Sequence, residues 1–116
     1  MTYDTEFWDY LERLVRETDV IIDRRKDTQH PDYEDTIYPL DYGYLAGTTS
    51  SDGAGIDVWI GTRQDQTVDG IICTIDLLGR DSEIKVLLGC SEQDMHTVMD
   101  FLNQGDMRGL LIKRDV

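Results

Sequence analysis

Basic residues are scarce in this sequence. Its 116 residues include 11 lysines and arginines against 24 aspartates and glutamates, which gives a formal net charge of −13. A protein that binds a phosphate backbone needs clusters of lysine and arginine to neutralise several phosphates, and this chain has hardly any such cluster. Nucleic acids and anionic membranes are therefore poor candidate partners.

Cysteines are few, and long apolar runs are lacking. Cys73 and Cys90 stand inside apolar segments without the spacing of a metal site, so we interpret both as small buried hydrophobic residues in a reducing cytoplasm. No apolar stretch approaches the ~20 residues that span a membrane. The first residues lack the basic and apolar regions of a secretion signal, which also favours a cytoplasmic location.

Helical periodicity is confined to two segments, one near each end of the chain. Hydrophobic residues make up 40% of the sequence, enough for one modest core, so we expect a single domain over residues 1–116. Apolar residues at helical spacing predict an amphipathic helix over residues 5–17. A second helix is expected after Ser91, which together with Asp94 has the pattern of a capping box.

Short apolar or alternating runs between these helices predict strands. They are Val20–Asp23, an interrupted extended segment over Thr36–Leu45, Ile56–Ile60, Gly70–Leu78, Glu83–Leu88 and a short final strand at Leu110–Ile112. The segment Gly79–Ser82 is short enough to join two of these strands as a hairpin. Because long helical patterns do not alternate with the strands, the predicted fold class is mainly β: a small, closed, mostly antiparallel barrel with an N-terminal and a C-terminal helix.

A glycine-rich turn carries two carboxylates. Asp52 and Asp57 bracket the segment Gly53–Ile56, and the turn can bring the first carboxylate toward the strand face that presents the second. Mg²⁺ takes hard oxygen ligands, usually one or two carboxylates together with water and substrate phosphate. This segment is therefore a candidate metal site, although taken alone it also fits an ordinary solvated turn.

Two further segments carry groups that can contact an anion. Tyr38, Tyr42 and Tyr44 share one strand parity, which fits either phenol hydroxyls that contact a phosphate or buried aromatic packing. Glu83 and Lys85 lie on one face of a predicted strand, where the alternative to a functional pair is an exposed ion pair.

In this order the three segments resemble the soluble (family I) inorganic pyrophosphatases. Those enzymes combine a Tyr-Pro-x-Asn/Asp-Tyr-Gly segment, an Asp-Gly-Asp-x-x-Asp-Val turn and a later acid-x-Lys strand. The matching segments here are Tyr38–Leu45, Asp52–Val58 and Glu83–Lys85, within a resemblance that covers about residues 20–88. It implies an OB-like barrel, hydrolysis of diphosphate to phosphate by metal-activated water, and Mg²⁺ or Mn²⁺ as the cofactor.

The resemblance also implies roles for individual residues. Tyr42 and Lys85 match phosphate-contacting positions of the family, and Glu83 stands where the family usually has a metal-ligating aspartate. The complete set of implied roles is catalysis by Asp57, Tyr42, Lys85 and Asp41; substrate binding by Arg25, Lys26, Tyr38, Tyr42 and Lys85; and metal binding by Asp52, Asp57, Asp81, Glu83 and Asp23.

The sequence departs from the family pattern inside the turn. Ala54 stands where the family has its middle aspartate, a residue commonly assigned to metal binding and to activation of the attacking water. We hypothesise that Asp41, at the family's common asparagine position, or Asp57 partly compensates for the missing carboxylate, or that turnover is slow.

Two more departures lie further along the chain. The acidic loop between Ile75 and Glu83 is shorter than in the family, so we expect Asp81, or failing that Asp76, to replace a metal ligand of that loop. The family's Tyr-Lys substrate pair has no counterpart after Ser91. The chain therefore looks like a short, divergent member of the family.

Two other classes of function stay open. The same barrel could serve as a non-catalytic module that binds a phosphate or a nucleotide, or as an interaction domain that uses Phe7–Val15 as a docking helix. Trp8 and Trp59 lie on otherwise polar faces and predict a subunit contact in a homo-oligomer. An oligonucleotide-binding groove is disfavoured by the negative charge.

Overall fold

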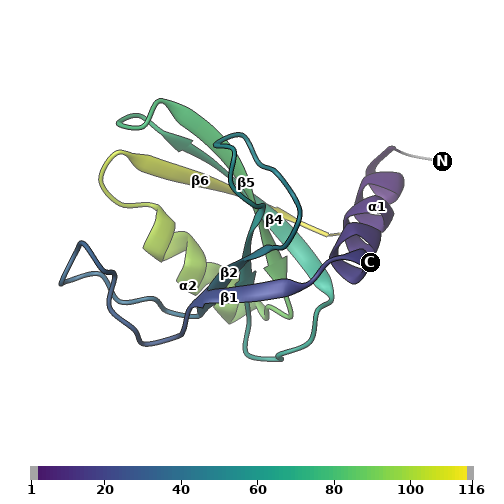
Figure 1. Ribbon diagram of the computed structural model, residues 1–116, viewed down its shortest axis with the longest axis horizontal. Helices are drawn as coiled ribbons and strands as arrows, with labels where there is room; N and C mark the ends of the chain where they lie inside the picture. Colours follow the sequence, from purple (N-terminus) through teal and green to yellow (C-terminus); the bar gives the residue numbers. More distant parts are fainter. Residues whose placement is uncertain (1–2, 115–116) are drawn as a thin grey trace.

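The computed structural model describes residues 3–114, which form six strands and two helices (Figure 1). The elements in chain order are α1 (Tyr3–Glu17), β1 (Val20–Arg24), β2 (Asp41–Leu45), β3 (Asp57–Ile60), β4 (Val68–Asp76), β5 (Asp81–Leu88), α2 (Glu92–Leu102) and β6 (Met107–Lys113).

All six strands belong to one sheet, in the order β1-β2-β3-β5-β4-β6. β3 and β5 run parallel, and every other neighbouring pair is antiparallel. The predicted fold class is confirmed: the chain is mainly β, with a helix before the sheet and another near its end. One detail differs, because within residues 3–114 β1 and β6 remain the two edges, so the sheet is barrel-like but not closed by hydrogen bonds.

Several predicted strand boundaries were wrong by a few residues, including the start of β2 at Asp41 instead of Thr36. The β4–β5 hairpin turns at residues 77–80 rather than at Gly79–Ser82, since Asp76 and Asp81 already pair across the strands. The last strand is longer than Leu110–Ile112, because Met107–Lys113 pairs along most of β4. Arg108 and Gly109 hid this strand from a search for apolar runs.

The two helices cover opposite faces of the sheet (Figure 1). α1 buries Trp8 and Val15 against one face, together with Val58, Val86 and Leu88. Much of its apolar stripe is therefore used inside the chain, and Phe7 remains 44% exposed.

α2 covers the other face and closes a second core. Met95, Val98 and Leu102 pack there with Ile72 and Leu87. The N-terminus of α2 has the predicted capping box, because the Ser91 hydroxyl accepts from the N–H of Asp94, and the Asp94 carboxylate accepts from the N–H of Ser91. The same carboxylate accepts from the N–H of Thr62 at 2.9 Å, which ties the helix to the segment after β3.

The tryptophans do not lie on the surface, contrary to our prediction. Trp8 is 8% exposed and Trp59 is 1% exposed. Trp59 shares a strand face with Asp57, but α2 and Tyr38 cover that face and make it a second core. Neither tryptophan therefore offers a large exposed surface to a second subunit.

Gly43 allows β1 and β2 to approach closely. A Cβ atom at this position would lie 1.8 Å from the carbonyl oxygen of Ile21, so only glycine fits. The register of this pair shifts between Ile22 and Arg24, where β1 has a bulge. The bulge matters for the site, because it places Arg24 directly opposite Tyr42.

Candidate functional site

Three neighbouring strands bring the predicted polar residues to one face of the sheet. In β3 and β5, Asp57 pairs with Lys85, and in β2 and β3, Tyr42 pairs with Trp59. Residues directly opposite each other share a face, and so do residues two apart in one strand. Glu83 therefore joins the same face, which is the face that α2 covers further along.

Lys85 lies at the centre of this cluster. Its Nζ donates to Oδ2 of Asp57 at 2.8 Å and lies 3.9 Å from Oε2 of Glu83. The same Nζ lies 5.7 Å from the centre of the Tyr42 ring, within range of a cation–π contact. The Lys85 side chain is only 6% exposed, so this is a buried ion pair and not the exposed pair that was the alternative.

The glycine-rich turn lies beside the cluster. Its Asp52 carboxylate accepts from the hydroxyl of Ser50 at 2.6 Å and from the N–H of Ala54 at 2.9 Å, and Gly53 supplies the positive φ of 85° that the turn needs. These hydrogen bonds, that of Ser50 first, lower the pKa of Asp52 below its ordinary value. The hydroxyl of Ser51 donates to the carbonyl of Ser82, which fixes the turn against β5.

The cluster holds several carboxylates close together, which contributes to the raised pKa values of Glu83 and Tyr42. Burial raises the pKa of Glu83 to about 7, and the carboxylates of Asp57 and Asp52 add to this rise against the opposing effect of Lys85. Oε1 of Glu83 is buried and has no hydrogen-bond partner in residues 3–114. Burial and the Asp57 carboxylate also raise the pKa of Tyr42, which favours its protonated phenol.

The raised pKa of Glu83 predicts a pH-dependent stability. Because the folded pKa lies above the ordinary 4.5, the folded chain holds this proton more tightly than the unfolded chain does. The stabilisation is complete below that ordinary value and is lost as the pH rises through about 7. We expect the unfolding free energy of the wild type, relative to Glu83→Gln, to fall by about 2 kcal/mol between about pH 5 and pH 8. Denaturant titrations without divalent cations measure this difference, and parallel pH profiles would contradict it.

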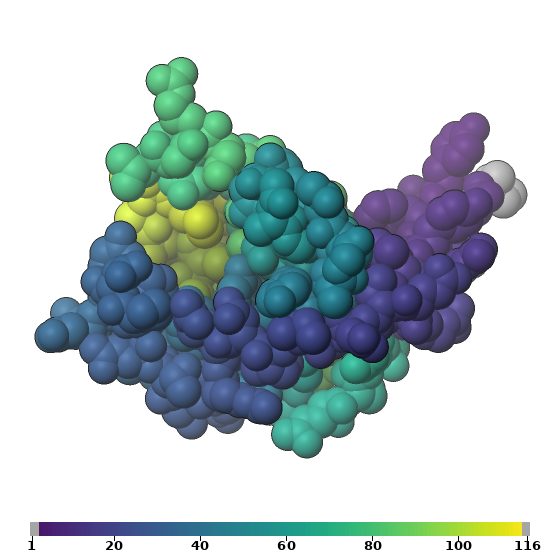
Figure 2. Space-filling view, in the orientation of Figure 1, coloured from purple at the N-terminus to yellow at the C-terminus, as the bar shows by residue number. Residues whose placement is uncertain are grey.

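A pocket of about 360 Å³ opens next to the cluster. Lys85 and Tyr42 contribute to its wall, α2 contributes Phe101, and the loop between β1 and β2 contributes His30 and Tyr33. Figure 2 shows a hollow on this side of the molecule, bounded by the residue 25–40 loop, the residue 48–55 turn and the β4–β5 hairpin, with the start of β6 at its floor.

The other predicted site residues lie outside the cluster. Oδ1 of Asp41 accepts from the N–H of Lys26 at 2.8 Å, and its Oδ2 lies 3.8 Å from Nη1 of Arg25, so these three organise the start of the loop. Asp23 is exposed on the edge strand β1, beside Arg24. Asp81 is exposed at the start of β5, opposite Asp76 and on the same face as Glu83.

Several residues that line or face the site are absent from the set of site residues that the sequence assigned. The bulge in β1 turns Arg24, and not Arg25 or Lys26, toward the face of Tyr42, and Nε of Arg24 is buried with no partner in the described chain. His30 and Phe101 reach the pocket from a loop and a helix that no local pattern connects to β3. For the tyrosines, the alternatives were aromatic packing and a position at the ligand site. Tyr38 and Tyr42 pack against the core and also line the pocket.

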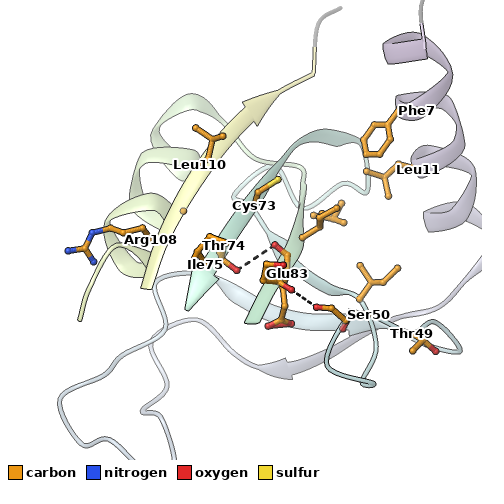
Figure 3. Close-up of a pocket in the computed structure, with 16 residues that line it drawn as sticks. Phe7, Leu11, Thr49, Ser50, Cys73, Thr74, Ile75, Glu83, Arg108 and Leu110 are labelled. Atoms are coloured by element: carbon orange, nitrogen blue, oxygen red, sulfur yellow. Dashed lines mark hydrogen bonds between the residues drawn. The ribbon is translucent and has the colours of Figure 1, made fainter. Parts of the chain in front are cut away.

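A larger cavity, of about 760 Å³, lies between α1 and the sheet. Figure 3 shows Phe7 and Leu11 on one side of it and Leu110 of β6 on the other, while the Arg108 side chain points away. Its lining is mostly apolar, with Ile75 and Ile84 among the exposed residues. Glu83 and Arg108 are its charged lining residues, and because the Arg108 side chain points away, the described lining turns no basic side chain toward a phosphate.

The cluster has the chemistry of a divalent-cation site without its finished geometry. Asp52, Asp57 and Glu83 offer hard carboxylate oxygens, and the buried, unpartnered Oε1 of Glu83 is an acceptor that such a cation would satisfy. Among residues 3–114, however, no group of three or more His, Cys, Asp or Glu side chains has the spacing of a metal site. In the present arrangement the ammonium of Lys85 balances the carboxylates of Asp57 and Glu83.

Comparisons with known proteins identify the fold. No protein-family model matches the sequence, and no curated protein matches it. Similar solved structures include an inorganic phosphatase from Anaplasma phagocytophilum, with a TM-score of 0.57, 15% identity and 81% of each chain covered. An inorganic pyrophosphatase from Coxiella burnetii has a TM-score of 0.53 and 15% identity over 81% of this chain and 82% of that one. One from Neisseria gonorrhoeae has a TM-score of 0.52 and 15% identity over 78% and 75%. At this identity the likeness shows that the chain has a pyrophosphatase-like fold.

Proposed function

We propose that this chain hydrolyses inorganic diphosphate to phosphate in a reaction that depends on Mg²⁺ or Mn²⁺. The observation that carries the proposal is the convergence of Asp57 and Glu83 on Lys85, with Asp52 near Glu83, beside a pocket that Lys85 and Tyr42 line in a pyrophosphatase-like fold. Phosphoryl transfer to water depends mostly on positioning and on stabilisation of charge, which are the two things this cluster can supply.

Each residue of the cluster has a role in this proposal. Asp52, Asp57 and Glu83 hold the cation, which when bound neutralises substrate charge and lowers the pKa of a coordinated water. Lys85 donates hydrogen bonds to phosphoryl oxygens. The Tyr42 hydroxyl is a second donor, because its raised pKa keeps it protonated.

We also propose roles for the predicted residues that lie outside the cluster. Arg25 and Lys26, at the exposed start of the loop, attract the anion, and Arg24 approaches it from the face of Tyr42. We propose Asp81 for a second cation because it shares a face of β5 with Glu83.

The test is phosphate release from diphosphate with Mg²⁺, compared with the same assay in excess chelator. We expect Asp57→Asn to lower kcat/KM by at least about 10²-fold, because it removes both a proposed ligand and the partner of Lys85. Asp100→Asn, an equal change at an exposed position of α2, serves as the matched control and is expected to have no effect. Phosphate release that ignores both the chelator and Asp57→Asn would refute the proposal.

A second candidate is a module that binds a phosphorylated ligand without hydrolysing it. Two observations favour it: Ala54 supplies no carboxylate to the turn, and Asp57 is already engaged by Lys85 at 2.8 Å. This candidate predicts Mg²⁺-dependent thermal stabilisation by diphosphate without release of phosphate.

Two wider expectations also remain proposals. Self-association into a homo-oligomer is best served by the exposed apolar residues beside the larger cavity, where Phe7, Ile84 and Leu110 are 44%, 44% and 64% exposed. Within residues 3–114, no helix combines the length and apolarity that would let it cross a membrane. Cys73 and Cys90 are free thiols, and a reducing compartment such as the cytoplasm would keep them so.

A further inference from the structure

The pocket beside the cluster is walled mainly by aromatic rings. Tyr33, His30, Tyr38 and Tyr42 follow one another with ring centres 4.9, 6.0 and 5.7 Å apart. The planes of His30 and Tyr38 differ by 11°, and those of Tyr38 and Tyr42 by 26°, so these rings stack. Phe101 extends the wall from α2, 5.5 Å from Tyr38.

Apart from the Tyr42 hydroxyl, the ring faces of this wall do not attract a bare diphosphate. The face of an aromatic ring carries partial negative charge and does not attract an anion. Lys85 is the one cationic side chain that lines the pocket among the residues described. A volume of about 360 Å³ lies in the range of pockets that hold organic ligands, and it extends from Lys85 out to His30 and Tyr33. The aromatic part of the pocket must therefore serve a part of the ligand other than its phosphates.

The loop that carries these rings is held in place by hydrogen bonds. His30 donates its N–H to the carbonyl of Thr36 at 2.8 Å, and Tyr38 donates to Thr28 at 2.9 Å. Nδ1 of His30 accepts from the N–H of Asp32 at 3.0 Å, which leaves Nε2 to carry the ring proton. His30 thus offers both a stacking face and a hydrogen-bond donor.

The pocket is also lined by polar groups that can hydrogen-bond to a ligand. Trp59, which lines it, is 1% exposed, and its Nε1 has no hydrogen-bond partner within residues 3–114. Thr36 and Gln104 add side chains that can meet the polar edge of a planar heterocycle. Stacking faces together with in-plane donors and acceptors are what a nucleobase requires, and stacking accepts any base.

We propose that the ligand of this site is a nucleoside diphosphate or triphosphate, with its base against the wall of His30 and Tyr33 and its phosphates at Lys85. This inference rests on the proposed function for the phosphate end alone. Hydrolysis of a nucleoside diphosphate consumes one water: an oxygen–phosphorus bond forms to that water, the bridging bond breaks, and nucleoside monophosphate, phosphate and a proton are released.

The test compares ADP, CDP, ribose 5-phosphate and inorganic diphosphate, each with Mg²⁺, by calorimetry and by phosphate release. We expect ADP and CDP to bind at least about fivefold more tightly than diphosphate, which lacks a base. Ribose 5-phosphate is expected to bind more weakly than either nucleotide. Nucleotide binding no tighter than that of diphosphate would overturn the inference.

Variants of the aromatic wall make the test specific. Tyr33→Ala and His30→Ala are expected to weaken ADP at least about fivefold more than they weaken diphosphate. Tyr10→Ala is the matched control, because Tyr10 is 72% exposed on α1, and it should change neither affinity. Equal losses for ADP and diphosphate would contradict a base-binding role.

The outcomes separate this inference from the proposed hydrolysis. Tight ADP binding that depends on Tyr33, without phosphate release from any compound, supports the inference and refutes hydrolysis. Diphosphate turnover by a chain that discriminates against ADP supports hydrolysis and refutes the inference.

Discussion

Lys85→Met is expected to lower the free energy of unfolding by about 3–5 kcal/mol, the range found when one partner of a buried ion pair is removed. The substitution leaves two carboxylates, Asp57 and Glu83, with side chains only 17% and 13% exposed and without their cation. Methionine fills similar space, so the loss comes from charge and not from a cavity. Denaturant titration in the absence of divalent cations measures the effect.

The chain contains a matched control for this experiment. Lys113 makes an ion pair with Glu92 at 2.6 Å, but their side chains are 49% and 68% exposed. Exposed pairs of this kind contribute about 0–1 kcal/mol, so Lys113→Met should be almost neutral. Adding Asp57→Asn to Lys85→Met should recover part of the stability, because it removes one uncompensated charge. Equal losses of unfolding free energy in the two lysine variants would show that the buried carboxylates do not need the charge of Lys85.

Ala54→Asp is expected to raise phosphate release from Mg²⁺-diphosphate by roughly 10²–10⁴-fold, the usual contribution of a positioned general base. The residue lies two positions from Asp52 in a turn that the Ser51 hydroxyl fixes against β5. Ala54 is exposed, so the variant should fold with nearly unchanged stability. The measurement is kcat/KM with Mg²⁺ in excess.

Thr49→Asp controls for added charge near the turn. Thr49 is exposed like Ala54 and receives the same carboxylate. It lies before Ser50 in the chain, outside the part of the turn that the hydrogen bonds of Ser50 and Ala54 to Asp52 hold together. It should give no gain in turnover. The absence of a gain in Ala54→Asp, or an equal gain in both variants, would mean that the missing carboxylate does not limit the rate.

Elements with strong local signals were predictable from the sequence. The capping box of Ser91 and Asp94 uses atoms three residues apart, so its pattern alone locates the start of α2. The helix near the N-terminus was visible for the same reason, because its spacing records which face is buried. Such features depend on neighbours in the chain and not on the rest of the fold.

Burial on both faces of a strand was not predictable in this way. The alternation in β3 suggested one apolar face and one polar face, which put Trp59 on the surface beside Asp57. In the fold, α2 covers the inner part of that face, and the charged part remains at its edge. A strand cannot show by its own sequence whether a distant helix will cover it.

Which basic side chain faces the site depends on a one-residue bulge in β1. A bulge in β1 places Arg24 opposite Tyr42, although regular alternation after Ile22 would have turned it away. Asp41 shows the opposite case: it is adjacent to Tyr42 in β2, and alternation alone places the two on different faces. The carboxylate cluster itself arises from the pairing of β3 with β5, which no local pattern specifies.

The parallel pairing of β3 with β5 has a consequence for how the protein assembles. Residues 20–60 form one local meander, and residues 68–113 form a second unit of hairpin, helix and strand. The two units share the ladder in which Asp57 pairs with Lys85, 28 positions apart in sequence. Non-local ladders of this kind form late in folding, because a long loop must close first. The cluster around Lys85 is therefore expected to complete only when the two halves join, and an opening of this ladder would separate Asp57 from Lys85.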